Sequence, residues 1–252
     1  MEIRTFHPRR GRMSRRHADA LAAMWPAYGL TVTDGDRTTL DLAALFGRDA
    51  PTVLEIGFGM GDATAAMAAA DPGRDYLAVE VHTPGIGNLL ALVEELGLTN
   101  VRVAHGDAMQ LIHRLGDGAL DAVHVFFPDP WPKLRHHKRR LIQPGNVALL
   151  RRALRVGGLL HCATDWPDYA AAMAATLAAD PELTRDEAGG ARPATKFERR
   201  GVDAGRPITD LTFRRTGSRP ESRPERGTAS RPESGPGSRT GSGSSSVHPG
   251  PE

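Results

Sequence analysis

Glycine occupies every second position at 57–61, directly after an apolar run that holds one carboxylate. The segment 53–61 reads Val-Leu-Glu-Ile-Gly-Phe-Gly-Met-Gly, and a helical pattern begins at Asp62. A second acidic residue, Glu80, ends the next apolar run. A strand, a tight glycine turn and a helix, followed by a carboxylate at the end of the next strand, are the parts of a site for a nucleoside-containing cofactor.

Short apolar runs alternate with helical patterns along most of the chain. The pattern predicts strands at 52–56, 76–81, 101–104, 122–127, 159–163 and 208–213, and helices at 14–25, 40–46, 62–70, 86–96, 144–155 and 168–179. This alternation indicates an α/β fold, in which a doubly wound, mainly parallel sheet is covered on both faces. Gly157 and Gly158 predict a turn that leads into the strand at 159–163.

Five carboxylates stand at or near the ends of the predicted strands. They are Glu55, Glu80, Asp107, Asp129 and Asp165. The carboxyl ends of parallel strands meet at one edge of a sheet, and ligands of such sheets bind at that edge. We therefore expect the five side chains to outline a ligand site.

The glycine spacing and Glu55 separate the possible cofactors. A dinucleotide site has the pattern G-x-G-x-x-G and leaves the helix N-terminus free for a pyrophosphate. Here the pattern is G-x-G-x-G, and Glu55 would repel a diphosphate but attract the α-ammonium of a methionine-like group. The sequence therefore favours S-adenosylmethionine. Glu80 would hold its ribose hydroxyls, and Asp107 would accept a hydrogen bond from its adenine amine.

Basic residues gather in dense blocks, although the 252-residue chain carries a net charge of only +2. Residues 4–16 hold six arginines and no acid, and residues 133–140 read Lys-Leu-Arg-His-His-Lys-Arg-Arg. Arg151, Arg152 and Arg155 follow on one predicted helix. Dense positive charge in a nearly neutral chain indicates a polyanionic partner, either RNA or DNA.

The segment from Thr216 onward is rich in Ser, Gly, Pro, Arg and Glu and holds a single valine. Such a composition cannot bury enough apolar surface to offset the entropy of ordering, so we expect it to be disordered. We divide the chain into a basic N-terminal segment with one helix (1–36), an α/β domain (37–215) and a disordered tail (216–252).

The sequence also bears on the cellular compartment. No apolar run approaches the roughly 20 residues that a membrane span needs, and the basic N-terminus lacks the apolar stretch of a signal peptide. Cys162 is the only cysteine, which excludes an intrachain disulfide and suits a reducing cytosol. We therefore expect a cytoplasmic protein that does not contact a membrane.

Several longer motifs occur in a fixed order. The chain contains E-I-G-F-G-x-G at 55–61, E-V-H at 80–82, F-F-P-D-P-W-P-K at 126–133, H-H-K-R-R at 136–140, A-T-D-W at 163–166 and T-K-F-E-R-R-G at 195–201. In this order and spacing the chain resembles the bacterial tRNA (guanine-N7-)-methyltransferase family over roughly residues 4–215. It departs from the family pattern at Arg206 and Thr209, where a histidine and often a tryptophan are expected.

The resemblance implies a class I methyltransferase with a seven-stranded sheet, whose methyltransferase domain is 37–215. It implies methyl transfer from S-adenosylmethionine to N7 of a guanosine at position 46, in the variable loop of tRNA. N7 carries a lone pair and no proton. For Asp129, the family's catalytic position, this favours hydrogen bonding and electrostatics over removal of a proton, and positioning, electrostatics and proton transfer all remain open.

The resemblance also implies which other residues act. Those that would bind the cofactor are Glu55, Gly57, Gly59, Gly61, Glu80, Asp107 and Asp129. Those that would contact the substrate are Lys133, Asp165, Thr195, Lys196, Phe197 and Glu198. The tRNA backbone would be held by Arg135, Lys138, Arg139 and Arg140. No obligate protein partner is implied, and both a monomer and a homodimer remain open. No metal is expected, because adjacent histidines such as His136 and His137 seldom ligate one ion and methylation of N7 needs none.

Three other functions remain open. The segment 129–131 is related to the loops with which other methyltransferases modify exocyclic amines of adenine or cytosine, although the segment 195–198 and the long basic block argue against them. An NAD-dependent oxidoreductase is disfavoured by Glu55 and by the glycine spacing. A non-catalytic RNA-binding protein is disfavoured because every carboxylate of the predicted edge is present. For Trp131, stacking on a base and packing as a hydrophobic lid are both open.

Overall fold

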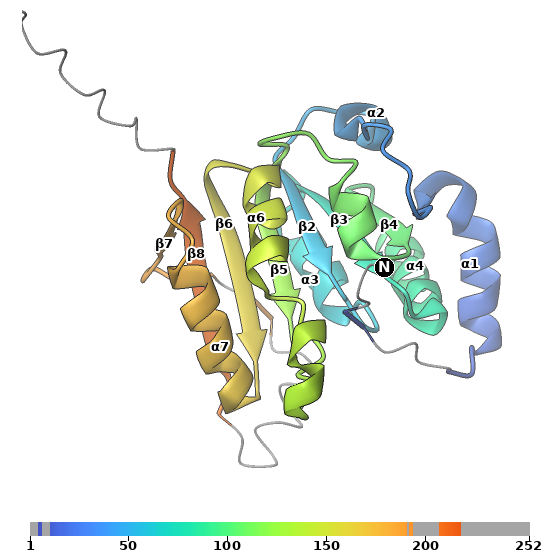
Figure 1. Cartoon of the computed structure of the whole chain (residues 1–252). Helices are drawn as coiled ribbons and strands as arrows, with labels where there is room; N and C mark the ends of the chain where they lie inside the picture. The colour runs from blue at the N-terminus through green and yellow to red at the C-terminus, as the bar shows by residue number, and fades with distance from the viewer. Residues whose placement is uncertain (1–4, 7–10, 191, 194–206, 218–252) are drawn as a thin grey trace, which may run out of the picture. The chain divides into compact units, whose positions relative to one another are not determined.

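The computed structural model describes residues 5–6, 11–190, 192–193 and 207–217 (Figure 1). Met1–Arg219 forms one compact unit, and the remaining unit, Pro220–Glu252, lies outside the described residues. The predicted substrate-binding residues at 195–198 and the predicted tail beyond Gly217 also lie outside them. Among the described helices, none has the length and apolar character needed to cross a bilayer.

Eight strands form one sheet in the order β1-β4-β3-β2-β5-β6-β8-β7. The strands are β1 (Gly29–Thr31), β2 (Thr52–Ile56), β3 (Asp75–Glu80), β4 (Val101–His105), β5 (Leu120–Phe126), β6 (Leu154–Thr164), β7 (Leu183–Arg185) and β8 (Thr209–Arg215). The first six pair in parallel, whereas β8 runs antiparallel to β6 and β7. The predicted doubly wound, mainly parallel sheet is confirmed. It has one strand more than the expected seven, because β1 adds to the edge beside β4.

Helices cover both faces of this sheet. They are α1 (Arg15–Tyr28), α2 (Leu42–Phe46), α3 (Asp62–Ala70), α4 (Thr83–Leu96), α5 (Ala108–Ile112), α6 (Pro144–Ala153) and α7 (Pro167–Ala178), with a 3₁₀ helix, η1 (Leu134–Arg139). α6 and α7 lie on one face and α3 and α4 on the other, where α1 packs against α4 (Figure 1).

Alternate residues of the central strands enter two separate apolar cores, one on each face. Leu54 and Ile56 of β2 belong to the core that includes side chains of α5, α6 and α7, whereas Val53 belongs to the core beneath α3 and α4. A strand buried on both faces has to be apolar along its whole length. This explains the apolar run at 53–56 and makes Glu55, which is also buried, its exception.

The predicted boundaries hold best for the two elements that flank the glycine turn. β2 and α3 match to the residue, and α4 begins earlier than expected, at Thr83, with Pro84 in its first turn where proline is favourable. The predicted turn at 157–158 is wrong, because β6 begins at Leu154 and the two glycines lie within it. The register of β5 against β6 shifts there, as a bulge requires. The sequence did not predict β1, β7, α5 or η1, each of three to six residues.

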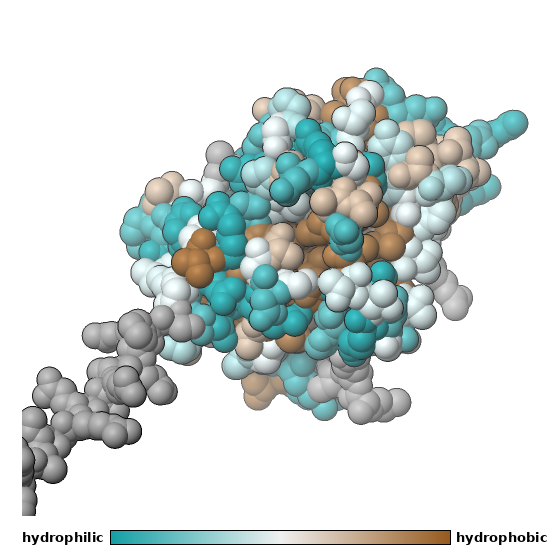
Figure 2. Space-filling view, turned by 90° about the horizontal axis from the view of Figure 1, so that it is seen from above, coloured by the Kyte–Doolittle hydropathy of each residue, from teal (hydrophilic) through white to brown (hydrophobic). Residues whose placement is uncertain are grey.

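The order of the strands fixes where a ligand can bind. The chain runs from β2 through β3 to β4 in one direction along the sheet and from β5 to β6 in the other. The direction therefore reverses between β2 and β5, and the loops that follow these two strands lie side by side at the carboxyl edge. In Figure 1 this edge faces down, as the arrowheads of β5 and β6 show. Figure 2 looks onto the opposite edge, where hydrophilic residues surround a central group of apolar ones.

Candidate active site

The turn after β2 depends on its three glycines. Gly57, Gly59 and Gly61 have φ angles of 76°, 62° and 80°, a region that side-chain-bearing residues rarely adopt. The N–H of Gly57 donates to the carbonyl of Val79 at 2.9 Å, which ties the turn to β3. A Cβ at Gly61 would stand 2.7 Å from Cβ of Leu89 on α4. The glycine spacing therefore serves both the backbone conformation and the close packing of α3 against α4.

Glu80, at the end of β3, holds this turn in place. Its Oε2 accepts a hydrogen bond from the N–H of Gly59 at 2.9 Å, and its Oε1 accepts from Val81 and His82 at 2.7 and 3.1 Å. A carboxylate offers about four acceptor positions. Three are in use, so the carboxylate keeps capacity for a ligand hydroxyl at the edge where a ribose was predicted.

Glu55 is buried behind the turn with an incomplete set of partners. The residue is 3% exposed, and its Oε2 has no hydrogen-bond partner among the residues that the structure describes. Burial raises the pKa of Glu55 to about 7, partly opposed by the nearby Thr64 hydroxyl, and the negative charge of Glu80 adds to the rise. A buried carboxylate oxygen without a partner is costly. A ligand that brings a cation to this point would remove that cost.

Asp107 lies two residues beyond β4 and caps α5. Its Oδ1 accepts a hydrogen bond from the N–H of Met109 at 2.8 Å. This contact accounts for the position of Asp107 at the edge. Its contact with the adenine amine stays a prediction.

The loop after β5 is strained on both sides of Asp129. Phe127 and Trp131 have φ angles of 51° and 45°, and they are the non-glycine residues with positive φ in the described part of the chain. Such a conformation is rare for bulky side chains and persists where the surroundings fix it, often at functional sites. Pro128 and Pro130 restrict the backbone between them. Asp129 is thus presented at the carboxyl edge by a loop with little freedom.

Contacts at both ends hold this loop in place. The N–H of Phe127 donates to the carbonyl of Ala163 at 2.8 Å, and Nε of Arg140 donates to the carbonyl of Pro130 at 2.9 Å. The glycine turn, the Glu55 and Glu80 carboxylates and this fixed loop therefore share one edge. Such an arrangement can hold a cationic, ribose-containing ligand next to a second substrate.

The sequence is also similar to known proteins. A family model described as "Putative methyltransferase" matches residues 49–211. The tRNA (guanine-N(7)-)-methyltransferase of Streptomyces avermitilis is 52% identical over 229 residues, which cover 88% of this chain and 78% of that protein. The protein of the same name from Halorhodospira halophila is 50% identical, over 84% of this chain and 95% of its own length. This chain belongs to the tRNA (guanine-N(7)-)-methyltransferase family.

Family membership confirms the resemblance drawn from the motifs and the predicted class of enzyme, a methyltransferase. S-adenosylmethionine, predicted from Glu55 and Glu80, is the methyl donor of that class. A solved structure supports the fold alone. The 16S rRNA methyltransferase KamB matches with a TM-score of 0.50 at 17% identity, over 86% of this chain and 100% of that one.

In this member of the tRNA (guanine-N(7)-)-methyltransferase family, Trp131 is packed inside the protein. The residue is 3% exposed, and its Nε1–H donates to the carbonyl of Thr5 at 3.2 Å. The guanidinium of Arg139 lies over the indole, 4.9 Å from the ring centroid, and His136 meets it edge-on. The indole therefore has no face open for a base, and packing as a hydrophobic lid is the reading that the structure supports.

The prediction that Arg140 holds the tRNA backbone is wrong. Arg140 is 2% exposed and lies over the ring of Tyr169, with 4.7 Å between the guanidinium and the ring centroid. Besides the carbonyl of Pro130, its guanidinium binds Asp168 at 2.5 Å. Its charge is committed inside the protein, where it supports the loop that carries Asp129.

The arginines at 151, 152 and 155 are also engaged within the protein. Arg151 pairs with Asp180 at 3.0 Å, Arg152 with Asp117 at 3.3 Å and Arg155 with Asp121 at 2.5 Å. Arg155 lies on β6 rather than on the predicted helix, because α6 ends at Ala153. This group of arginines therefore stabilises the fold and gives no support for a polyanion site.

The exposed cations of the block 133–140 lie near the carboxyl edge. Lys133, Arg135 and Lys138 are exposed on and next to η1. The N-terminal basic segment comes close to the same edge at two points. Thr5 contacts Trp131, and a Cβ at Gly11 would stand 2.6 Å from Nε2 of His82. Two described residues of the N-terminal segment, Thr5 and Gly11, thus lie next to elements of the site.

Asp165 directly follows β6, so the structure places it at the carboxyl edge as predicted. Thr195, Lys196, Phe197 and Glu198 lie outside the described residues. In the described ranges, the side chains of His, Cys, Asp and Glu do not form a group of three that could hold a metal ion.

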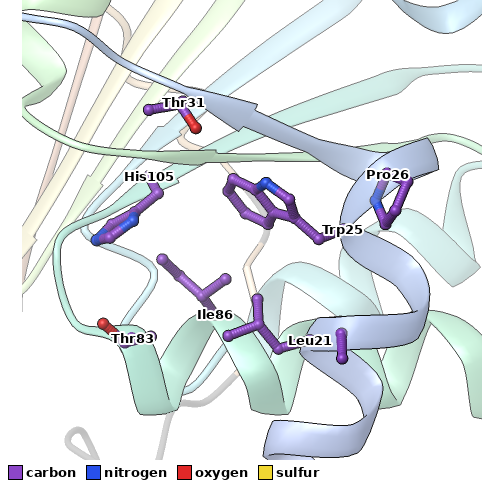
Figure 3. A pocket seen from close by; sticks show the side chains of 8 residues that line it. Leu21, Trp25, Pro26, Thr31, Thr83, Ile86 and His105 are labelled. Atoms are coloured by element: carbon purple, nitrogen blue, oxygen red, sulfur yellow. The ribbon is translucent and has the colours of Figure 1, made fainter.

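A pocket of about 380 Å³ lies beside the edge, between α1 and α4 (Figure 3). Leu21, Trp25, Ile86 and His105 line it, and Trp25 meets His105 edge-on at 6.4 Å between ring centroids. His105 is the register partner of Glu80. The pocket thus borders the end of the site where Glu80 lies. The sequence did not predict it, because its walls come from α1, β1, α4 and β4.

Proposed function

We propose that this chain transfers a methyl group from S-adenosylmethionine to N7 of a guanosine in tRNA. The observation that carries the proposal is an identity of 50–52% to proteins named tRNA (guanine-N(7)-)-methyltransferase, over most of the chain. The finer assignment, the guanosine at position 46 of the variable loop, belongs to the same proposal and rests on the motif resemblance.

The cofactor fits the residues at the carboxyl edge. Oε2 of Glu55 is buried and unpartnered, which suits the α-ammonium of the methionine moiety. Glu80 has acceptor capacity left for the ribose hydroxyls, and the glycines at 57, 59 and 61 allow close approach of the backbone. Asp107 would accept a hydrogen bond from the adenine amine. The sulfonium of the bound cofactor supplies an electrophilic methyl group.

The acceptor needs alignment more than activation. N7 of guanine carries a lone pair and no proton, so no side chain has to remove one. Asp129, held by the strained loop, would hydrogen bond to the guanine edge or the cofactor and stabilise the positive charge that develops on the purine. Asp165 would accept from N1–H and N2–H of guanine, which adenine does not present. Glu198 would do the same, with Thr195, Lys196 and Phe197 beside it.

The basic surface around the edge suits a tRNA backbone. Lys133, Arg135 and Lys138 are exposed, and the arginines at 12 and 15 stand exposed near the start of α1. Contacts with phosphates bring affinity that falls with salt and set the orientation of the nucleic acid. A tRNA substrate agrees with the cytoplasmic location expected from the sequence. A monomer or a homodimer both suffice, since the carboxylates of the site come from one chain and no protein partner is needed.

Mass spectrometry of nucleosides tests the proposal. Unmodified tRNA incubated with the pure protein and S-adenosylmethionine should yield 7-methylguanosine. Borohydride–aniline treatment should then cut the tRNA at the modified nucleotide and identify its position. Methylated exocyclic amines would instead favour an amino-methyltransferase, and tRNA binding without any methylated product would favour a non-catalytic protein.

A further inference from the structure

Arg192 and Asp210 form an ion pair that the proposed chemistry does not use. Arg192 donates Nε–H to Oδ1 of Asp210 at 2.7 Å and Nη2–H to Oδ2 at 2.9 Å, which is the two-pronged geometry of strong arginine–carboxylate pairs. The Arg192 side chain is 6% exposed. Oδ1 of Asp210 also lies 2.7 Å from Nε2 of His161, which is fully buried on β6. Side chains from β6 and from the segment after β7 therefore converge on one carboxylate of β8.

A close backbone approach brings Arg192 to this point. Gly189 has a φ of 69°, and Gly190 lies so near His161 that a Cβ there would stand 2.5 Å from Nδ1 of the imidazole. Glycine is the residue that permits this contact. The sequence thus directs the segment after β7 across His161 and sets Arg192 against β8.

The guanidinium of Arg192 also covers the start of the Asp129 loop. It lies 5.6 Å from the ring centroid of Phe126 and 5.3 Å from that of Phe127, within the range of cation–π contacts. Phe127 is one of the two strained residues of the loop, and its N–H is held by Ala163. Its backbone and its ring are therefore both fixed, two residues before Asp129.

We propose that Arg192, held by Asp210, is a positioning residue for methyl transfer: it keeps Phe127 in its strained conformation and so fixes the pose of Asp129. Arg192 precedes Thr195, the first predicted substrate-binding residue of its segment, by only a few positions. The inference rests on the proposed function.

Arg192→Met and Asp210→Asn test it with tRNA methylation. We expect kcat at saturating tRNA to fall about 10- to 100-fold in both variants, as for a misplaced reacting group. The Kd for S-adenosylmethionine should stay within about twofold, because Glu55 and Glu80 lie on β2 and β3, away from the ion pair. The KM for tRNA should stay within about threefold. Arg192→Lys keeps the charge but not the two-pronged geometry, so it should recover part of the loss.

Arg214→Met is the matched control. Arg214 lies on β8, the strand that also holds Asp210, and it pairs with Asp186. Its register partner on β6 is Leu159, away from the carboxyl edge. The kcat of Arg214→Met should stay within about twofold of the wild type. A double variant, Arg192→Met with Phe127→Leu, tests whether Arg192 acts on Asp129 through Phe127. If Arg192 acts through Phe127, the double variant should lose little more than the worse single variant, because coupled residues are not additive.

Three outcomes would overturn the inference. The first is a kcat of Arg192→Met within about twofold of the wild type, and the second is full additivity in the double variant. The third is a loss of cofactor-binding stoichiometry that matches the loss of kcat in both Arg192→Met and Asp210→Asn, which would assign the pair to folding alone. A wild-type protein that methylates no tRNA would instead contradict the proposed function.

Discussion

Oε2 of Glu80 accepts a hydrogen bond from the backbone N–H of Gly59 at 2.9 Å. The contact joins the end of β3 to the turn after β2, while Oε1 of the same carboxylate accepts from Val81 and His82. One side chain therefore shapes the glycine turn and faces the proposed ribose at the same time. Loss of its charge should affect cofactor binding before it affects any later step.

Glu80→Gln should raise the Kd for S-adenosylmethionine about 10- to 100-fold, because a hydrogen bond to a charged group is worth roughly 1.5–3 kcal/mol. The amide keeps the shape of the side chain but has one acceptor oxygen instead of two. Titration calorimetry measures the change. Glu94→Gln, on the exposed side of α4, is the matched control and should bind like the wild type. An unaltered Kd in Glu80→Gln would remove Glu80 from the cofactor site.

Asp129→Asn should separate turnover from cofactor binding. We expect kcat for tRNA methylation to fall about 100-fold, the scale of losing one group that stabilises the charge of a transition state. The Kd for S-adenosylmethionine should change by less than about threefold if the main role of Asp129 lies in the transition state. Asp117→Asn, at the opposite edge of the sheet, is the control. Full activity of Asp129→Asn would exclude Asp129 from the mechanism.

The fold and the carboxylate edge could be predicted because they follow from local patterns. Thr52–Ile56 and Asp62–Ala70 show their periods within one segment, and the rule that parallel strands end at one edge then gathers Glu55, Glu80 and Asp129. The roles of the arginines depend instead on contacts between distant segments. Arg140 looks like its neighbours in the sequence, but it is buried against Pro130 and Asp168.

The same limit applies to Trp131 and to the basic residues at 151–155. The indole N–H of Trp131 donates to the carbonyl of Thr5, which lies 126 positions earlier in the sequence. Arg151 pairs with Asp180, which follows α7. A count of charges cannot distinguish a paired cation from an exposed one, because the pairing is decided by the packing of whole elements. The strain at Phe127 likewise has no signal in composition.

Lys133, Arg135 and Lys138 are the exposed cations expected to bind tRNA phosphates. Replacing all three by Gln should raise KM for tRNA without changing the Kd for S-adenosylmethionine. It should also lower the slope of log KM against log salt by about 2 to 3, because each phosphate contact contributes roughly 0.7–0.9. Arg74→Gln, at the amino ends of the strands, is the control. An unchanged slope would place the tRNA on another surface.

We propose that the residues beyond the domain are dispensable for catalysis. The structure moves the boundary slightly past the predicted 215, because the N–H of Thr216 donates to the carbonyl of Glu182 at 2.8 Å. Truncation after Arg219 should leave the Tm unchanged and the specific activity within about twofold, since the composition of the tail cannot support a packed core. Methylation assays on the truncated and full-length proteins measure this. A large loss of activity would show that the tail takes part in substrate binding.

Proton release should accompany cofactor binding. Burial raises the pKa of Glu55 to about 7, so the free protein holds a proton on this carboxyl below that pH. An ammonium group beside Glu55 favours the charged form. Binding of S-adenosylmethionine should therefore release a proton below pH 7, and the Kd should rise about tenfold for each pH unit below it. Calorimetry in buffers of different ionisation enthalpy, over about pH 5.5–7.5 where α-amino groups remain mostly protonated, measures the proton directly.

The free energy of unfolding of the cofactor-free protein should also depend on pH through the Glu55 carboxyl. The pKa of Glu55 is raised from 4.5 to about 7, so the folded state holds the proton more tightly than the unfolded state. This contribution to stability is complete below about pH 4.5 and is lost as the pH rises through 7. Glu55→Gln cannot ionise, so it should remove this loss of stability, bind the cofactor more weakly and release no proton. A wild-type binding enthalpy at pH 6 that does not depend on the buffer would contradict this coupling, because the protonation of Glu55 would then be the same in the free protein and in the complex.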